Sequence, residues 1–269
     1  DNYDSMAAVI IKDMDAIKKE YGRKRRTAIE NAEEAVYEEK KMEEMEVCFL
    51  MDRFGYMKLI DKNAYERNKE AVHNENKYVF NCMNTDKICI FTDTGKMHTI
   101  KAVDIPLGRF RDKGTPVDNL SNYDSSQERM LYVAPVGQLR SDRLLFVTKT
   151  SMCKLVEGAE FDVAKRTIAS TKLADEDELI FIGSASEMEQ IVLQSHGGCF
   201  LRFLTQEVST MKKTALGVRG MKLADDDYLE HAYLLAGHQE YTISYHDKEY
   251  ALNKVRLAKR DTKGIKPRI

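Results

Sequence analysis

The sequence contains no run of about 18 apolar residues, the length that a membrane-spanning helix requires. Its first ten residues, DNYDSMAAVI, show no basic segment followed by a long apolar stretch, so they do not resemble a secretory signal peptide. These two absences argue against a membrane protein or a secreted protein and predict a location in the cytoplasm.

The cysteines are few, and none of them forms a CxxC pair. There are five, an odd number, so a disulfide framework and a cysteine-ligated zinc site are both unexpected. A reducing compartment fits this usage best. Cys48 and Cys89 share the second position of their copies of the repeat described below, and Cys153 and Cys199 fall in the second strands of theirs, which predicts small buried apolar side chains rather than nucleophiles.

Recognisable catalytic motifs are also missing. The sequence contains no GxxxxGK[ST] phosphate-binding loop, no HExxH zinc motif and no GxSxG nucleophile elbow. His196 stands beside two glycines and is expected to be a turn residue rather than a general base. No catalytic residue is predicted, so the chain is not expected to be an enzyme by itself.

The formal net charge of -2 hides an uneven distribution along the chain. Residues 1–46 hold 13 acidic and 9 basic residues, whereas residues 47–269 hold 31 acidic and 33 basic residues. The segment 254–268, KVRLAKRDTKGIKPR, has 7 bases and 1 acid. Such a tail is typical of an arm that binds nucleic acid or an anionic surface, and a solvated, disordered terminus is the alternative.

Residues 1–46 are predicted to be helical. Apolar residues from Met6 to Tyr21 recur at helical spacing, and Gly22 is the expected C-cap. The acidic stretch 28–46 has high helix propensity but a weaker apolar stripe, so we interpret it as a solvated helix or linker.

After Glu46 the pattern changes to short apolar runs rich in β-branched and aromatic residues, such as VCFLM, ICIFT and LLFVT. Runs of this length, bounded by Gly, Asp, Asn or Lys, predict an all-β domain over residues 47–269. Five of the runs open a recurring hairpin, whose copies start at Val47, Ile88, Leu144, Ile191 and Tyr241. Each copy has a tight turn at Gly55, Gly95, Ser151, Gly198 or Asp247. A hairpin that recurs about every 40–50 residues predicts a propeller-like fold with about five blades.

The word KLAD occurs twice, at Lys172–Asp175 and at Lys222–Asp225, and in both places acidic residues follow. Both copies fall at the same point of the repeat, which favours a polar turn between strands. The alternative is a divalent-cation site formed by Asp175, Asp177, Asp225 and Asp227. The Gly and Glu that an EF-hand loop requires are not in place, so the turn is the preferred interpretation.

These segments also carry a resemblance to a known family. GTPVDNL, ALGVRGMKLADDDYL and TDTGKMHTIKAVDIP are similar to the repeats in the C-terminal domain of the A subunit of bacterial type IIA topoisomerases, gyrase and topoisomerase IV. IKKEYGRKRRTAIENAEE resembles the stretch where those proteins leave their coiled coil. The resemblance implies a β-pinwheel whose blades exchange strands and whose outer rim binds and bends double-stranded DNA.

In that family the rim is basic, so the resemblance implies DNA contacts in and around the loop that follows each hairpin. The residues at these places are Lys58, Arg67, Lys101, Arg109, Arg111, Lys113, Lys165, Arg166, Arg202, Lys212, Lys213, Arg219, Lys254, Arg256, Lys259, Arg260 and Lys263. Equivalent loops around a disc would form a stripe that follows a phosphate backbone without reading its sequence.

One departure from the gyrase pattern is visible. The A subunits of gyrases carry a Gln-Arg-Arg-Gly-Gly-Lys-Gly box in a loop of the first blade, which in that family is needed for full wrapping of DNA. The equivalent segment here reads YERNKEAVHNENKY. KRDTKGIK is a partial echo near the end, with Arg260, Lys263 and Gly264 in similar positions. The missing box and the five repeats resemble topoisomerase IV more than gyrase.

The resemblance implies a non-catalytic DNA-bending module that belongs to an A2B2 enzyme. The DNA-cleaving tyrosine and the ATP and Mg²⁺ sites of such an enzyme lie outside a segment of this kind, so no cofactor is expected here. Two other hypotheses remain at this point: a propeller-type protein-interaction scaffold, which the near-neutral net charge would suit, and a metal-dependent hydrolase that uses the KLAD acids.

Overall fold

The computed structural model describes residues 3–24, 26–27, 43–237 and 239–267. The chain divides into two compact units, Asp1–Glu43 and Glu44–Ile269. The boundary predicted from the sequence, between residues 46 and 47, falls close to this division.

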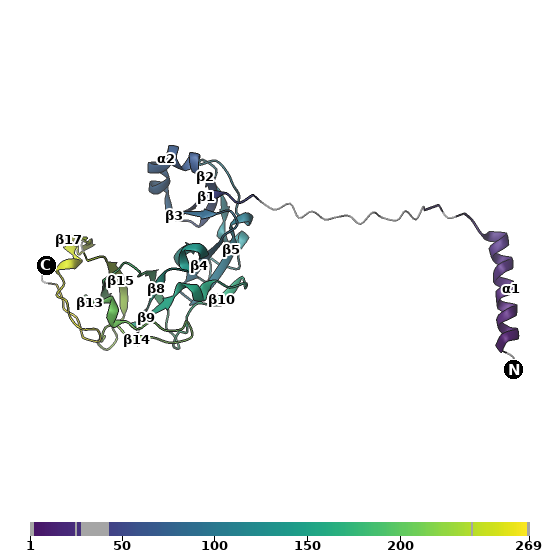
Figure 1. Cartoon of the computed structure of the whole chain (residues 1–269). Helices are drawn as coiled ribbons and strands as arrows, with labels where there is room; N and C mark the ends of the chain where they lie inside the picture. The colour runs from purple at the N-terminus through teal and green to yellow at the C-terminus, as the bar shows by residue number, and fades with distance from the viewer. Residues whose placement is uncertain (1–2, 25, 28–42, 238, 268–269) are drawn as a thin grey trace. The chain divides into compact units, whose positions relative to one another are not determined.

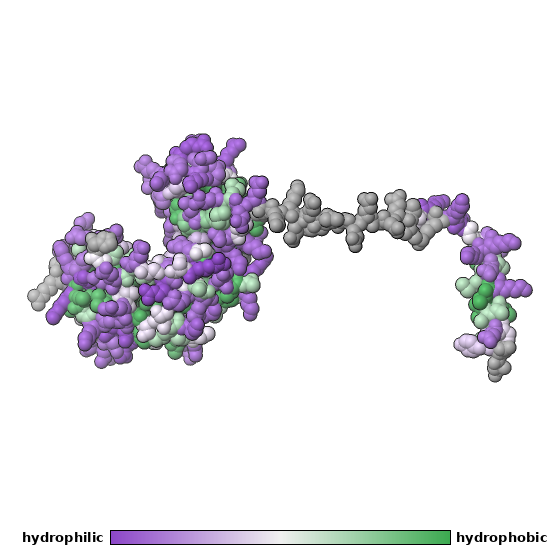
Figure 2. Space-filling view, in the orientation of Figure 1, coloured by the Kyte–Doolittle hydropathy of each residue, from purple (hydrophilic) through white to green (hydrophobic). Residues whose placement is uncertain are grey.

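The first unit contains the helix α1 (Tyr3–Tyr21), which ends where the sequence predicts it to end. The backbone N–H of Gly22 donates to the carbonyl oxygen of Lys18 at 2.9 Å. Every residue of α1 is exposed, and its apolar stripe is visible as green side chains in Figure 2. The second predicted helix lies mostly outside the described residues, and its last residues, 43–46, are not helical.

The described residues of the second unit form five antiparallel hairpins, as predicted. Their strands are β1 (Glu46–Asp52) with β2 (Tyr56–Asp61), β4 (Lys87–Thr92) with β5 (Lys96–Lys101), β8 (Arg143–Thr148) with β9 (Met152–Glu157), β12 (Gln190–Ser195) with β13 (Phe200–Leu204), and β16 (Thr242–Tyr245) with β17 (Lys248–Ala251). Gly55, Gly95, Ser151, Gly198 and Asp247 all have positive φ angles, between 58° and 83°. A tight hairpin turn requires this left-handed backbone, which explains the small or turn-forming residue in each copy.

Four of the hairpins gain a third strand from farther along the same repeat. These strands are β3 (Asn76–Met83), β7 (Met130–Pro135), β11 (Leu179–Ser184) and β15 (Leu229–Leu235), and each pairs with the first strand of its own hairpin. The described part of the chain therefore forms five sheets, here called blades 1 to 5, which follow one another in chain order in Figure 1. The all-β, propeller-like architecture predicted from the sequence is confirmed.

The fourth strand of a blade comes from the next repeat. The strands β6 (Thr115–Pro116), β10 (Thr167–Ala169) and β14 (Val218–Arg219) pair with β2, β5 and β9 of the preceding blade. We call the stretches that contain them, 102–116, 158–169 and 205–219, together with the similar stretch 252–265, the crossing segments. Each starts with a short 3-10 turn: η1 (Ala102–Asp104), η2 (Gly158–Phe161), η3 (Thr205–Glu207) or η4 (Leu252–Lys254).

The last crossing segment corrects one expectation from the sequence. Residues 252–265 are not a disordered terminus or a free arm, because they run along β13 of blade 4. Phe200 and Ile265 form an antiparallel bridge, and Arg202 and Leu257 form a parallel one. The basic tail is therefore part of the folded domain through these contacts.

The apolar core lies between successive blades. In β4, Ile88 and Ile90 pack toward blade 1, whereas Cys89 and Phe91 pack toward blade 3. Because both faces of such a strand are buried, the sequence shows continuous apolar runs rather than alternation. Burial raises the pKa of the Cys89 thiol to about 12, in agreement with its predicted apolar role, whereas Cys199, also predicted to be buried, is only half-buried.

Within the residues that the structure describes, no blade precedes blade 1, and a helix covers that face of its sheet. This helix, α2 (Lys62–Glu75), packs Val72 against Leu50 and Ile60, all fully buried. Asp61 caps it, accepting the backbone N–H of Ala64 at 2.8 Å. The loop predicted for this stretch from the sequence is therefore wrong. Two further short helices, α3 (Val117–Leu120) and α4 (Val136–Leu139), connect strands.

Candidate nucleic-acid interface

Most of the basic residues predicted to contact DNA lie on the crossing segments. These are Arg109, Arg111, Lys113, Lys165, Arg166, Lys212, Lys213, Arg219, Lys254, Arg256, Lys259, Arg260 and Lys263. Of the other four, Lys58 lies in β2, Arg67 in α2, Lys101 at the end of β5 and Arg202 in β13. The strand exchange thus brings cations from successive repeats to equivalent places at the edges of neighbouring blades.

Three of the four crossing segments share one geometry. Each approaches the preceding blade through a parallel bridge, formed by Leu107, Thr210 or Leu257. The same number of residues later, each contains a glycine with positive φ: Gly114 at 81°, Gly217 at 108° and Gly264 at 72°. A Cβ atom on these glycines would lie 2.5–2.7 Å from a backbone carbonyl oxygen of the neighbouring strand, so the segment can lie this close only with glycine.

Between the bridge and the glycine each of these three segments bends outward. In the first two, the backbone N–H of Asp112 donates to Arg109 O at 3.0 Å, and that of Ala215 donates to Lys212 O at 2.9 Å. In the third, the Thr262 hydroxyl donates to Lys259 O at 3.0 Å. We call 109–112, 212–215 and 259–262 the rim bends. Their first residues, Arg109, Lys212 and Lys259, are all exposed cations at one structural position.

Several of the predicted cations also hold neighbouring chain in place. The Lys213 ammonium donates to Glu160 O at 2.9 Å, and Lys212 lies 3.5 Å from the Glu160 carboxylate. Arg219 forms a bidentate ion pair with Asp261, in which Nε donates to Oδ1 at 2.5 Å and Nη2 donates to Oδ2 at 3.0 Å. Lys212 keeps 82% of its side chain exposed, so its ion pair leaves it accessible to a second anion.

Of the predicted residues that lie on strands, Lys58 and Arg202 point into the protein rather than away from it. The Lys58 ammonium donates to the carbonyl oxygens of Phe110 and Asp112. The Arg202 guanidinium donates to the carbonyl oxygens of Asn253 and Val255 and to Gln190. Both side chains are half-buried. These hydrogen bonds make Lys58 and Arg202 weaker candidates for phosphate contacts than the exposed cations of the rim bends.

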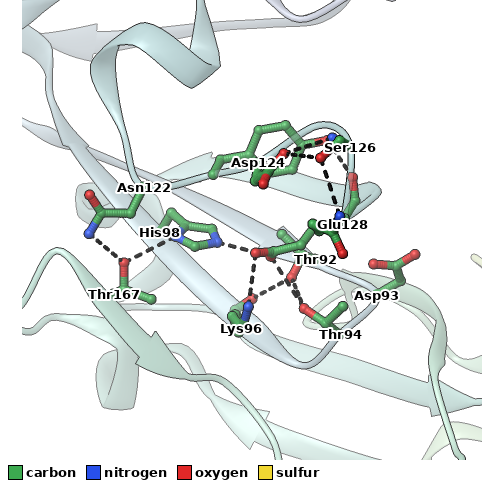
Figure 3. A network of polar contacts seen from close by, with 12 residues as sticks. Thr92, Asp93, Thr94, Lys96, His98, Asn122, Asp124, Ser126, Glu128 and Thr167 are labelled. Atoms are coloured by element: carbon green, nitrogen blue, oxygen red, sulfur yellow. Dashed lines mark hydrogen bonds and ion pairs between the residues drawn. The ribbon is translucent and has the colours of Figure 1, made fainter.

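The second crossing segment is shorter and has no rim bend. Its strand β10 is held by His98 of β5, which is buried: Nδ1 lies 3.1 Å from the Thr167 hydroxyl and Nε2 lies 3.0 Å from the Glu128 carboxylate (Figure 3). Lys96 donates to the same carboxylate at 3.0 Å. Burial alone would raise the pKa of Glu128, but hydrogen bonds from His98, Thr92 and Lys96 outweigh it and lower that pKa to about 2.

The segment equivalent to the gyrase box is folded as α2 and the start of β3. Its predicted DNA contact, Arg67, is exposed and donates through Nε to the carbonyl oxygen of Asn63 at 3.1 Å. The partial echo KRDTKG coincides with the third rim bend and its glycine, Gly264. That echo therefore shares the bridge, outward bend and glycine of the first two rim bends.

The acidic KLAD segments are turns, as the repeat indicated. Glu176 and Asp226 take the left-handed conformation, with φ of 59° and 61°. The next residue of each, Asp177 or Asp227, accepts a backbone N–H from the hairpin turn of the same repeat, from Thr150 at 3.0 Å and from Gly197 at 2.8 Å. Among the described residues no group of three His, Cys, Asp or Glu side chains is placed to hold a metal ion.

No helix in the described part of the chain has the length and apolar character to cross a membrane. His196 is exposed at the hairpin turn of blade 4, where its ring stacks on Tyr228 at 4.7 Å between centroids. This placement agrees with a turn residue.

Comparison with known proteins agrees with the architecture. Residues 86–125, 142–186 and 189–236 match the family model described as the DNA gyrase C-terminal domain, beta-propeller. The matched segments contain the hairpins of blades 2, 3 and 4.

Sequence relatives include the A subunit of DNA gyrase from Clostridium acetobutylicum, which is 29% identical over 79% of this chain and 27% of that protein. The corresponding gyrase protein of Ureaplasma parvum is 24% identical over 98% of this chain and 33% of that protein. The chain thus spans about a quarter to a third of the length of these curated relatives.

Solved structures with the same fold include the C-terminal domain of DNA topoisomerase IV, with a TM-score of 0.73 and 22% identity over 83% of this chain and 73% of that one. The C-terminal domain of DNA gyrase A has a TM-score of 0.55 and 18% identity over 82% of this chain and 76% of that one. These likenesses extend the agreement in fold beyond the three matched segments.

Proposed function

Because three segments of the chain match the family model of the DNA gyrase C-terminal domain and the fold agrees with it, we propose that the chain is a non-catalytic module that binds and bends double-stranded DNA. One observation supports the location of the contacts. The three rim bends present Arg109, Lys212 and Lys259 at one equivalent, exposed position of their repeats. Cations repeated at one structural position can follow a phosphate backbone, whereas isolated surface lysines have no such order.

Contacts of this kind give affinity without sequence preference. Each neutralised phosphate releases condensed counterions, so the logarithm of affinity falls linearly with the logarithm of salt concentration, with a slope of about -0.9 per phosphate on duplex DNA. Contacts with several blades at once would also offset the free-energy cost of bending the duplex, which is about 1–6 kcal/mol for a bend of 40–90°.

The module acts as part of an A subunit that assembles with an ATPase B subunit into an A2B2 type IIA topoisomerase of the bacterial cytoplasm, with a topoisomerase IV-like role favoured over a gyrase-like one. The ATP and Mg²⁺ sites lie in other parts of that enzyme. This chain alone neither cleaves nor relaxes supercoiled plasmid.

The test compares two double charge reversals that change the net charge equally. Arg109→Glu with Lys212→Glu removes two rim cations, and Lys18→Glu with Lys19→Glu removes two cations of α1. The rim pair is expected to weaken binding to a random-sequence duplex and to flatten the salt slope by about 1.8, because two phosphate contacts are lost. The α1 pair is expected to leave both nearly unchanged.

Affinity that does not change with salt, or equal effects of the two pairs, would contradict the proposal. Salt-independent binding would favour the alternative of a protein-interaction scaffold. Arg111 and Lys213 are added as reversals in a second step, because Lys213 also donates to the backbone at Glu160 and its loss could disturb the rim bend itself.

A further inference from the structure

Two lysines occupy the same place in two different hairpins and make the same pair of contacts. The Lys154 ammonium in β9 donates to Lys213 O at 2.8 Å and to Ala215 O at 2.6 Å. The Lys58 ammonium in β2 donates to the equivalent carbonyls, those of Phe110 and Asp112. Each lysine thus lies beneath a rim bend and closes it from inside.

Lys154 is buried to a degree that is rare for a lysine. Only 1% of the residue is exposed, and its ammonium lies 5.7 Å from the centroid of the Phe146 ring. A buried charge is costly unless hydrogen bonds replace its lost water, and the two carbonyl oxygens do so here. Burial lowers the pKa of Lys154 to about 8, although Glu160 acts in the opposite direction. Such a residue cannot reach a phosphate outside the protein.

In blades 2 and 4 the strand position of Lys58 and Lys154 holds a different residue, and no lysine donates from it to a rim bend. In blade 3, Lys154 pairs with Phe146 of the neighbouring strand. The equivalent pairs are His98 with Ile90 in blade 2 and Leu201 with Leu193 in blade 4. His98 accompanies the short crossing segment, which has no rim bend. Leu201 accompanies the third rim bend, whose Arg260 donates instead to the carbonyl oxygens of Glu207 and Arg219.

We infer that Lys154 and Lys58 are positioning residues of the DNA-binding surface, whose ammonium groups hold the rim bends in the shape that presents Lys212 and Arg109. This inference rests on the proposed function. It assigns the two lysines a role inside the protein rather than on the DNA, because their donors are directed at backbone carbonyls and Lys154 has almost no exposed surface.

The test is Lys154→Leu, because blade 4 accommodates Leu201 at this same place. The variant is expected to keep the melting temperature nearly unchanged while its affinity for duplex DNA falls by about 3- to 10-fold and its salt slope flattens by about 1. Lys18→Leu, which removes the same charge from α1, is the control and is expected to bind as the wild type does. Amide hydrogen exchange of residues 208–216 should become faster in Lys154→Leu only.

A double-mutant cycle separates positioning from a direct contact. If Lys154 acts through the rim bend, Lys154→Leu should cost little in a chain that already carries Lys212→Gln and Lys213→Gln, because the cations it positions are gone. Fully additive effects would overturn the inference, as would wild-type affinity and salt slope in Lys154→Leu.

Lys58→Leu provides a second, less buried variant, for which Arg109→Gln is the matching background. If both leucine variants fail to fold, the lysines serve the fold rather than the surface, and the inference is overturned. If the wild-type chain binds no DNA, the proposed function falls and the inference falls with it. If the wild type binds DNA but the leucine variants show neither the lower affinity nor the flatter salt slope, the inference is wrong and the proposed function stands.

Discussion

At the scale of single residues, Glu128 is a charged group that is both buried and held by several hydrogen bonds. Only 3% of its side chain is exposed, and it accepts hydrogen bonds from His98 of β5 and from Lys96 of the same strand. His98 in turn contacts Thr167 of the exchanged strand β10 (Figure 3). One carboxylate therefore stabilises the contact between two repeats.

This carboxylate makes stability depend on pH in the acidic range. The pKa of Glu128 is about 2 in the folded chain and near 4.5 in a model peptide. Above pH 4.5 the group is ionised in both states and its stabilisation is fully present. Between pH 4.5 and 2 the unfolded chain takes up a proton that the folded chain excludes, so this stabilisation is lost as the pH falls, by up to about 3 kcal/mol.

Glu128→Gln is therefore expected to lower the free energy of unfolding at pH 7 by about 2–3 kcal/mol and to flatten its decline between pH 4.5 and 2. Urea unfolding at a series of pH values measures both effects. Glu187→Gln, at an exposed position, is the control. A Glu128→Gln variant with the same pH profile as the wild type would contradict this account of the network.

At the scale of elements, the rim bends depend on their glycines. A Cβ on Gly217 would lie 2.7 Å from Cys153 O, and φ there is 108°. Gly217→Ala is expected to lower the free energy of unfolding by about 1–3 kcal/mol, because the segment must move away from β9. Thermal unfolding measures the change.

Gly137→Ala is the matched control for this substitution. Gly137 is exposed and lies in α4, and the carboxylate oxygens of Asp86, at 3.6 Å from the added Cβ, are in ordinary van der Waals contact with it. The control is expected to be neutral or slightly stabilising, because alanine favours helix. If both variants lost the same free energy of unfolding, the close approach of the crossing segment to β9 would not be the reason for glycine at position 217.

The hairpins could be predicted from the sequence, whereas the partners of the crossing segments could not. A hairpin is local: its apolar runs and its turn residue, such as Gly95 or Ser151, stand next to each other in the chain. The pairing of β14 with β9 joins residues that lie far apart in sequence and involves only Val218 and Arg219. Two residues carry no periodicity, so the family resemblance alone suggested the exchange of strands.

The same limit explains which side-chain directions could be predicted from the sequence. Exposed cations such as Arg109 and Lys212 follow from composition and position in the repeat. The inward direction of Lys58 could not be read from composition, because a lysine between apolar residues can also point to solvent. The repeat held a usable signal, since Lys58 and Lys154 fall at the same place in two copies. The helix α2 was missed because its sequence is mostly polar and only Val72 is buried.

At the scale of the whole molecule, α1 buries none of its residues. Removing residues 1–43 is therefore expected to leave the unfolding midpoint of the second unit and its affinity for DNA unchanged. Chemical denaturation and a binding titration of the chain that starts at Glu44 measure both. A lower midpoint, or a loss of affinity beyond about 3-fold, would mean that the first unit contributes to the DNA-binding domain.

The whole domain is expected to bend DNA without forming a stable wrap of one handedness, because α2 stands where the gyrase family has its box. Bound to relaxed circular DNA and treated with a nicking-closing enzyme, it is expected to change the linking number little. Truncating the tail is not a clean control, because residues 252–265 complete blade 4. Lys259→Gln with Lys263→Gln tests its cations instead.

A large linking-number change of one sign would contradict this prediction. If Lys259→Gln with Lys263→Gln then abolished that change, the third rim bend would be doing what the box does in gyrase, and the domain would be gyrase-like.

The strand exchange also has a consequence for the order in which the chain can fold as it is made. Blade 3 has its hairpin once Glu157 has been synthesised, but its outer strand β14 begins only at Val218. At about 5–20 residues per second the ribosome needs roughly 3–12 seconds to supply it. During that interval β9 presents an unpaired edge, which can pair with another nascent chain. Each blade that receives an exchanged strand is therefore complete only after the next repeat has been synthesised. Slower translation lengthens the time in which the unpaired edge can pair with a neighbouring chain.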